Sequence, residues 1–200
     1  MLRKISLLLV VMVFMVSGLC WADSWEANLS AGNTSAMGGV HYKRELATGY
    51  MKTGVSGIYT DDNDLDYRWA EFTFAVGSEN IQPGLTCEVG LKGILGDAEE
   101  SYFSGDIGTV AFDGYAGYIF PRHVMPMPLE IFGGLSYAPE VLSFRDTEDF
   151  FSYRFGVGLR IVENASVILE YSAFDMDMEA GPGPWNLDDD VIRLGLHMRF

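Results

Sequence analysis

The sequence has few of the features that mark several common classes of protein. Its 200 residues include only two cysteines, and only Cys87 follows the first two dozen residues. A single cysteine cannot form an intramolecular disulfide, so other interactions must stabilise the fold. Beyond those first residues, no apolar run is long enough for a transmembrane helix. Bases are also scarce, with 13 Lys and Arg against 28 Asp and Glu, and this excess of acids argues against nucleic-acid binding.

The first residues have the composition of a secretory signal peptide. Two bases precede an almost unbroken apolar segment, and Ala22 ends a loose small-x-small cleavage site. The apolar segment is short for a membrane-spanning helix. A lipid anchor on Cys20 is a second alternative, but Leu19 stands where a small residue is usual. We therefore expect a cleaved signal peptide, 1–22, and one exported domain, 23–200.

After the signal peptide, the dominant pattern is strict alternation of apolar and polar side chains. It is cleanest in 151–161, where Phe, Tyr, Phe, Val, Leu and Ile alternate with Ser, Arg, Gly, Gly and Arg. Only a β-strand places successive side chains on opposite faces. The pattern predicts ten strands, near residues 24–33, 36–46, 50–60, 67–77, 84–95, 106–120, 128–138, 150–162, 165–175 and 190–200.

The connections between these strands alternate in length and charge. Short links are expected after most even-numbered strands, as in a hairpin turn. The links after the odd-numbered strands are mostly longer. The regions around them, 61–66, 97–106, 140–149 and 175–190, contain 18 acids and a single base, Arg145. Alternating rims are typical of an up-and-down barrel, and outer-membrane barrels have short periplasmic turns and longer extracellular loops. We expect acidic extracellular loops at 61–66, 96–105, 139–149 and 176–189.

Alternation alone does not distinguish a membrane barrel from a soluble sandwich. A sandwich buries its apolar faces and places its charges in water. A membrane barrel reverses this arrangement, with hydrocarbon outside and a polar lumen inside. The signal peptide, the strand lengths, the asymmetric links and the aromatic residues near strand ends favour the barrel. The sequence therefore predicts an all-β, antiparallel transmembrane barrel in the outer membrane of a Gram-negative cell, with a soluble periplasmic β-protein as the alternative.

The polar faces of the predicted strands would enclose a balanced set of charges. A ten-stranded barrel is narrow, and buried acid–base pairs lock such a barrel more readily than they form a wide channel. We therefore expect a narrow polar lumen rather than a wide porin. The predicted lumenal residues are the acids Glu26, Glu71, Glu88, Asp113, Glu130 and Glu170 and the bases Lys52, Lys92, Arg154, Arg160, Arg193 and Arg199.

Several segments carry a resemblance to a known family. They are the strand end and loop 137–144, the acidic run 62–66, the segment 155–160 and the terminal Phe200, which looks like a C-terminal membrane-insertion signature. In this order they resemble the YfaZ family of predicted bacterial outer-membrane proteins, over most of residues 24–200. The resemblance implies an outer-membrane β-barrel and no enzymatic activity.

Candidate catalytic and metal-binding residues are few. Of three histidines, only His41 is expected near the outer rim, where Ser30 or Ser35 could be its neighbour. The acids spaced two apart in 62–66 and 175–179 lack the Gly and Glu that complete an EF-hand. We expect no catalytic residue, no metal site and no cofactor.

The sequence thus predicts a monomeric barrel with a structural or interaction role. Its expected partners are outer-membrane lipid, lipopolysaccharide bridged by divalent cations, and the machinery that inserts outer-membrane proteins. The alternatives are a small cation-preferring pore and a barrel hydrolase that uses His41.

Overall fold

The computed structural model describes residues 23–62, 65–100, 103–121, 123–125, 127–180 and 183–200, which form one closed β-barrel. The signal peptide predicted for residues 1–22 lies outside the described residues. Among the described residues, no helix is long and apolar enough to cross a membrane. The strands are β1 (Asp23–Ala31), β2 (Ser35–Leu46), β3 (Gly49–Asp61), β4 (Leu65–Gln82), β5 (Leu85–Glu100), β6 (Phe103–Ile119), β7 (Leu129–Ala138), β8 (Thr147–Val162), β9 (Ala165–Ala180) and β10 (Gly183–Arg199), with a short 3₁₀ helix, η1 (Glu140–Leu142).

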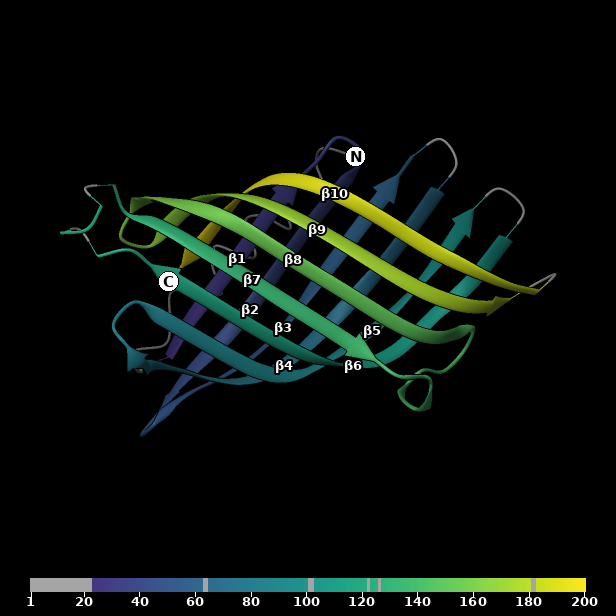
Figure 1. Ribbon diagram of the computed structural model, residues 1–200, viewed down its shortest axis with the longest axis horizontal. Helices are drawn as coiled ribbons and strands as arrows, with labels where there is room; N and C mark the ends of the chain where they lie inside the picture. The colour runs from purple at the N-terminus through teal and green to yellow at the C-terminus, as the bar shows by residue number, and fades with distance from the viewer. Residues whose placement is uncertain (1–22, 63–64, 101–102, 122, 126, 181–182) are drawn as a thin grey trace, which may run out of the picture.

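Each strand pairs antiparallel with the next one along the chain, and β1 pairs with β10 to close the barrel. Figure 1 shows the tilted strands of the near wall crossing those of the far wall. Trp25 and Phe200 exchange two backbone hydrogen bonds, of 2.9 Å and 2.7 Å, so the first and last strands meet at one end of the barrel. We call this the inner end, and the opposite end the outer end. The predicted up-and-down barrel of ten strands is confirmed.

Large apolar side chains cover the outside wall of the barrel. Phe72, Phe155 and Leu194 are 52%, 56% and 62% exposed, whereas Glu71 and Arg193 point into the barrel and are 7% and 3% exposed. A water-soluble protein does not leave so extensive an apolar belt in contact with solvent. A closed barrel satisfies its backbone hydrogen bonds internally, as a bilayer requires. The barrel therefore spans a membrane, and a soluble sandwich is wrong, because no pair of sheets in the described chain buries this belt.

The alternation reverses polarity towards the outer end. In the membrane-spanning part of β9, Leu169 faces outward and Glu170 is buried inside. Further along the same strand, Asp175 faces outward while Met176 and Met178 are fully buried inside. The strand thus passes from lipid to water, and its inward side chains change from charged to apolar at the same height.

Two segments predicted as acidic outer loops, 96–105 and 176–189, are mostly strand. β5 and β6 remain paired up to Glu100 and Phe103, and β9 and β10 up to Ala180 and Gly183. The prediction was wrong because it sought strands with apolar outward faces, whereas here the acids alternate outward with apolar residues that face inward. The acids of these segments therefore stand on the outer surface of strands rather than on long loops.

A third predicted loop, 139–149, is hydrogen-bonded to β6 and forms part of the barrel wall. Above the short strand β7, the segment 143–147 lies along β6. The Phe144 backbone N–H donates to the Gly108 carbonyl at 2.8 Å, and the Gly108 N–H donates to Thr147 Oγ1 at 3.1 Å. Side-chain and backbone bonds to this segment thus replace the missing part of β7, and they tie the outer part of β6 to the wall.

Candidate functional site

The inside of the barrel has two layers of opposite character. Charged side chains fill the layer nearer the inner end, and apolar side chains fill the layer nearer the outer end. The prediction of a polar lumen therefore applies only to the inner layer. For the outer layer it is wrong, because the inward side chains there are apolar, both in predicted strands, as at Tyr67 and Trp69, and in segments that had been assigned to loops. The residues in the former loops are Ala98, Met176, Met178, Trp185 and Leu187.

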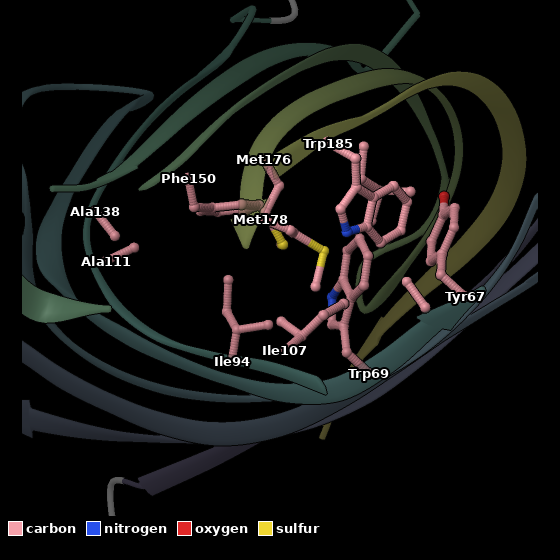
Figure 2. Packing of buried hydrophobic residues seen from close by; sticks show 12 residues of the cluster. Tyr67, Trp69, Ile94, Ile107, Ala111, Ala138, Phe150, Met176, Met178 and Trp185 are labelled. Atoms are coloured by element: carbon pink, nitrogen blue, oxygen red, sulfur yellow. The ribbon is translucent and has the colours of Figure 1, made fainter. Parts of the chain in front are cut away.

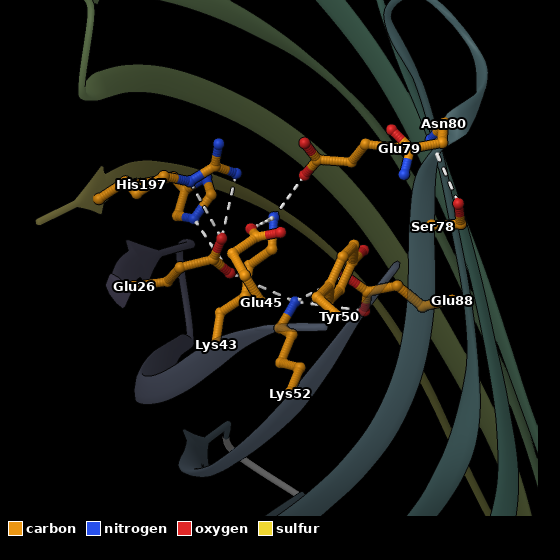
Figure 3. Close-up of polar contacts among 11 residues, drawn as sticks. Glu26, Lys43, Glu45, Tyr50, Lys52, Ser78, Glu79, Asn80, Glu88 and His197 are labelled. Carbon is orange, nitrogen blue, oxygen red and sulfur yellow. Dashed lines mark hydrogen bonds and ion pairs between the residues drawn. The ribbon is translucent and has the colours of Figure 1, made fainter. Parts of the chain in front are cut away.

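Glu26 is the centre of the ion pairs closest to the inner end (Figure 3). Its carboxylate oxygens lie 3.0 Å from Arg199 Nη2, 3.4 Å from Lys52 Nζ and 3.9 Å from His197 Nε2. Lys52 Nζ also lies 3.2 Å from Glu88 Oε1. These contacts link β1, β3, β5 and β10, so they span the seam where the first and last strands close the barrel.

Lys43 is a further buried cation with an acidic partner, which the sequence prediction missed. It pairs with Glu79, lies 3.6 Å from Glu45, and its Nζ stands 4.0 Å from the centre of the Tyr50 ring. Glu79 had been assigned to a turn at 78–83, but β4 continues through it. The inward position of Lys43 could have been found from the sequence, because Lys43 shares a face with His41 in the strand predicted at 36–46.

Lys92 joins two carboxylates at mid-height in the barrel. Its Nζ lies 3.0 Å from Asp113 Oδ1 and 3.8 Å from Glu71 Oε2, and it donates a hydrogen bond of 3.1 Å to Ser136 Oγ. Ser136 in turn donates to Asp113 at 2.6 Å. Lys92 of β5 thus pairs with an acid on each of the two flanking strands, β4 and β6, and also donates to the hydroxyl of Ser136.

Arg193 makes the corresponding contacts on the other side of the lumen. Its Nη1 lies 3.8 Å from Glu170 Oε1 and donates to Ser172 Oγ at 2.6 Å. Its Nε donates to Ser35 Oγ at 3.0 Å. This guanidinium therefore connects β10 with β9 and β2 just below the apolar layer.

Three predicted lumenal residues stand apart from these pairs. In the part of the chain that the structure describes, Glu130, Arg154 and Arg160 have no oppositely charged partner within 4.0 Å, although all three line the inner cavity. The Arg154 guanidinium lies 5.8 Å from the centre of the Tyr115 ring. The other nine predicted residues, together with Lys43, Glu79 and His197, form the inner charge ladder, which consists of Glu26, Lys43, Lys52, Glu71, Glu79, Glu88, Lys92, Asp113, Glu170, Arg193, His197 and Arg199.

A cavity of about 150 Å³ lies among these charges. It reaches the inner rim, where Glu163 and Asn164 of a turn form part of its wall. Its upper limit lies at Glu71, Lys92, Arg154 and Glu170, which also line a smaller space of about 60 Å³ bounded by Tyr67 and Trp69. The cavity is thus a vestibule that opens towards the inner end.

The outer layer is a packed apolar core that joins opposite walls of the barrel (Figure 2). Tyr67 and Trp69 of β4 stack with ring centres 4.6 Å apart, and Trp69 meets Phe174 of β9 edge-on at 5.0 Å. Phe103 of β6 stacks on Trp185 of β10 at 5.6 Å. We call this cluster the outer core, and it consists of Tyr67, Trp69, Ile94, Ala98, Ile107, Ala111, Ala138, Phe150, Met176, Met178, Trp185 and Leu187.

His41 lies inside the barrel beside the inner charge ladder. A methyl group at Gly54 would come within 2.4 Å of its ring, so the imidazole packs directly on that glycine. The two serines considered as its neighbours are engaged or distant, since Ser35 accepts from Arg193 and no hydrogen bond joins Ser30 to His41 within the described chain. Among the described residues, no group of three or more His, Cys, Asp or Glu is arranged to hold a metal ion.

No protein-family model matches the chain, and no curated protein matches it. Solved outer-membrane structures are similar at low identity. The NanC porin is 11% identical, with 88% of this chain and 99% of that chain covered and a TM-score of 0.44. The KdgM porin in complex with disordered oligogalacturonate is 10% identical, with coverages of 88% and 99% and a TM-score of 0.43. The Omp33 outer membrane protein of Acinetobacter baumannii is 9% identical, with coverages of 89% and 96% and a TM-score of 0.30.

The closed strand register, the apolar outside wall and the charged interior define the chain as an outer-membrane β-barrel. This assignment rests on the geometry of the barrel itself. The resemblance to the YfaZ family stays a prediction.

Proposed function

We propose that this chain is a closed outer-membrane barrel with a structural and interaction role. The observation that carries the proposal is the outer core, which fills the barrel from wall to wall. Ile94, Ile107, Met176 and Met178 have no exposed surface. A hydrated ion would have to displace these packed side chains and lose its water to cross them, and apolar constrictions of this kind exclude ions.

The outer end supplies the surface for an interaction role. Its outward side chains are mostly acids, and the described strand tips carry them on paired backbone rather than on long loops. Extracellular loops and tips are the part of an outer-membrane barrel that faces the surroundings. Exposed acids that contribute to this surface include Asp61, Asp66, Glu99, Asp106, Asp175, Glu179, Asp188 and Asp190.

The conductance of the purified barrel in a planar lipid bilayer tests this proposal. We expect insertion without discrete current steps, because the outer core blocks the lumen. Steady single-channel steps that disappear when Lys92→Glu or Arg154→Glu reverses a lumenal charge would contradict closure.

A small cation-preferring pore is the second candidate. The inner cavity favours it, because eight Asp and Glu side chains line that space against six Lys and Arg. In this case the same bilayer recording would show steps, and their reversal potential in a salt gradient would have the sign for cations.

A hydrolase is not favoured by the position of His41. Its ring packs on Gly54 inside the lumen, away from the outer rim where a substrate would arrive. We therefore propose that the chain is not an enzyme, and an esterase activity abolished by His41→Ala would contradict this.

A further inference from the structure

The barrel does not close along the full height of β10. β1 pairs with β10 only up to Ala31, which lies opposite Leu194. β10 continues outward to Gly183, and over that length β9 is its only strand partner among the residues that the structure describes. Figure 1 shows β10, in yellow, running past the end of β1 alongside β9. The outer part of β10 is therefore a free strand edge.

The backbone groups on this edge follow from the pairing at the inner end. Trp25 and Phe200 exchange both of their hydrogen bonds, so Phe200 directs its N–H and C=O towards β1. In an antiparallel pair this direction alternates along the strand, and the register of β10 shows no shift. The even-numbered residues of β10 therefore direct their backbone N–H and C=O groups towards the β1 side. At the outer end, these are Asn186, Asp188 and Asp190.

Pro184 agrees with this assignment. It is an even-numbered residue within a paired strand, where a proline is tolerated only if its missing N–H faces an unpaired side. Gly32 marks where the free edge begins, because a methyl group there would come within 2.7 Å of the Ile192 carbonyl oxygen. The free groups thus extend from Asn186 to Asp190 within the described residues.

The free edge is held from behind by the outer core. Trp185 stacks on Phe103, Leu187 is 1% exposed, and Asp189 accepts a hydrogen bond of 2.8 Å from the Tyr67 hydroxyl. These odd-numbered side chains point inward and fix the strand in an extended conformation. A partner strand would therefore find its template already ordered, which lowers the entropic cost of pairing.

The side chains beside the edge define the chemistry of the partner. Asp188 and Asp190 are exposed, and Asn186 donates to both Asp175 and Asp177, at 2.9 Å and 2.8 Å. A second copy of β10 would bring two rows of acids together, and like charges directly opposite one another destabilise a strand pair. A cationic strand would place its basic side chains beside these carboxylates.

We propose that the outer edge of β10, from Asn186 to Asp190, is a β-augmentation site for an extended cationic segment of a protein at the cell surface. Backbone hydrogen bonds to the free edge supply the pairing, and the acids on the outward face select basic side chains. This inference deepens the proposed interaction role of the outer end.

The test uses a capped peptide of about seven residues, a typical strand length, with alternating lysine and valine. Its binding to the full barrel in nanodiscs is compared for Asp188→Asn and Asp188→Pro. Both variants lose the charge, but only proline removes the backbone N–H from the free edge. We expect Asp188→Pro to bind the peptide about tenfold more weakly than Asp188→Asn, the equivalent of one lost backbone hydrogen bond.

Two controls keep the result interpretable. A peptide of alternating glutamate and valine should not bind, and heat-modifiable mobility on a gel reports whether each variant has folded. If Asp188→Pro fails to fold, the lysine peptide with N-methylated pairing residues makes the same comparison on the wild type.

Equal binding by Asp188→Asn and Asp188→Pro, or by the methylated and unmethylated peptides, would overturn the inference, as would no binding of the lysine peptide. Peptide-free dimers cross-linked through Asp188→Cys would identify a second copy as the occupant and would also overturn it. This test does not depend on conductance. A barrel that conducts ions but binds the peptide would contradict a blocked lumen and would still support the binding site on the edge of β10.

Discussion

Lys92 shows at the scale of one residue how the charged layer holds together. It lies between Asp113 and Glu71, and all three side chains are largely withdrawn from solvent. A buried carboxylate that loses its cation keeps the cost of desolvation without the compensating attraction. The stability of this layer therefore depends on each cation being present, rather than on the number of pairs.

Replacing Lys92 with methionine tests this dependence. We expect Lys92→Met to lower the free energy of unfolding by about 3 kcal/mol, because two buried acids lose their shared partner. Arg68→Met is the matched control, since Arg68 pairs with Asp97 at 2.9 Å on the exposed outer wall. That variant should change stability by no more than about 0.5 kcal/mol. Urea titrations in liposomes measure both, and equal losses would contradict a buried charge layer.

β10 shows at the scale of one element how a strand can serve two media. Its outward side chains are apolar at Leu194 and Ile192 and acidic at Asp190 and Asp188, while Arg193 and Leu187 face inward. The membrane boundary therefore lies between Ile192 and Asp190. Above this boundary the strand resembles one from a soluble barrel, with Trp185 and Leu187 packed on its inner face beside Asp189, which the Tyr67 hydroxyl binds, and acids on its outer face.

Two substitutions on the same face of β10 test this boundary. We expect Leu194→Arg to destabilise the barrel by about 1–2 kcal/mol, because Leu194 faces lipid between the membrane boundary and the bilayer centre, where the cost of an arginine is below its midplane value of about 2–4 kcal/mol. Asp188→Arg, on the same face but in water, should be close to neutral. The measurement is again the urea dependence of folding in liposomes. Similar values for the two variants would mean that lipid does not surround Leu194.

This reversal also explains what the sequence could and could not predict. The alternation in 151–161 specified strand, register and inward charges such as Arg154, because one polarity holds over the whole segment. In 176–189, the acids alternate with Met176, Met178, Trp185 and Leu187, a pattern that was interpreted as a loop. The ion pair between Lys43 and Glu79 was missed because partners from different strands are set by barrel closure, which one sequence does not reveal.

The whole molecule combines a charged vestibule, an outer core and an acidic outer end in one barrel. The outer core joins β4, β6, β9 and β10 across the lumen, so the outer end behaves as the packed interior of a soluble domain. The same arrangement thus blocks the lumen and presents the acids of the outer end to the surroundings. The expected signal peptide, the monomeric state and the lipid partners stay predictions.

Spin labels along β10 in proteoliposomes test the central claim most directly. Cysteines introduced in a Cys87→Ser background at 186, 188, 190, 192, 194 and 196 would carry labels on the outward face, and cysteines at 185 and 187 would carry labels on the inward face. We predict that accessibility switches from a water-soluble nickel reagent to membrane-dissolved oxygen between 190 and 192. The labels at 185 and 187 should be shielded from the nickel reagent. Nickel access at 185 and 187, or the absence of a switch along the outward face, would contradict a barrel closed by an apolar core above the membrane.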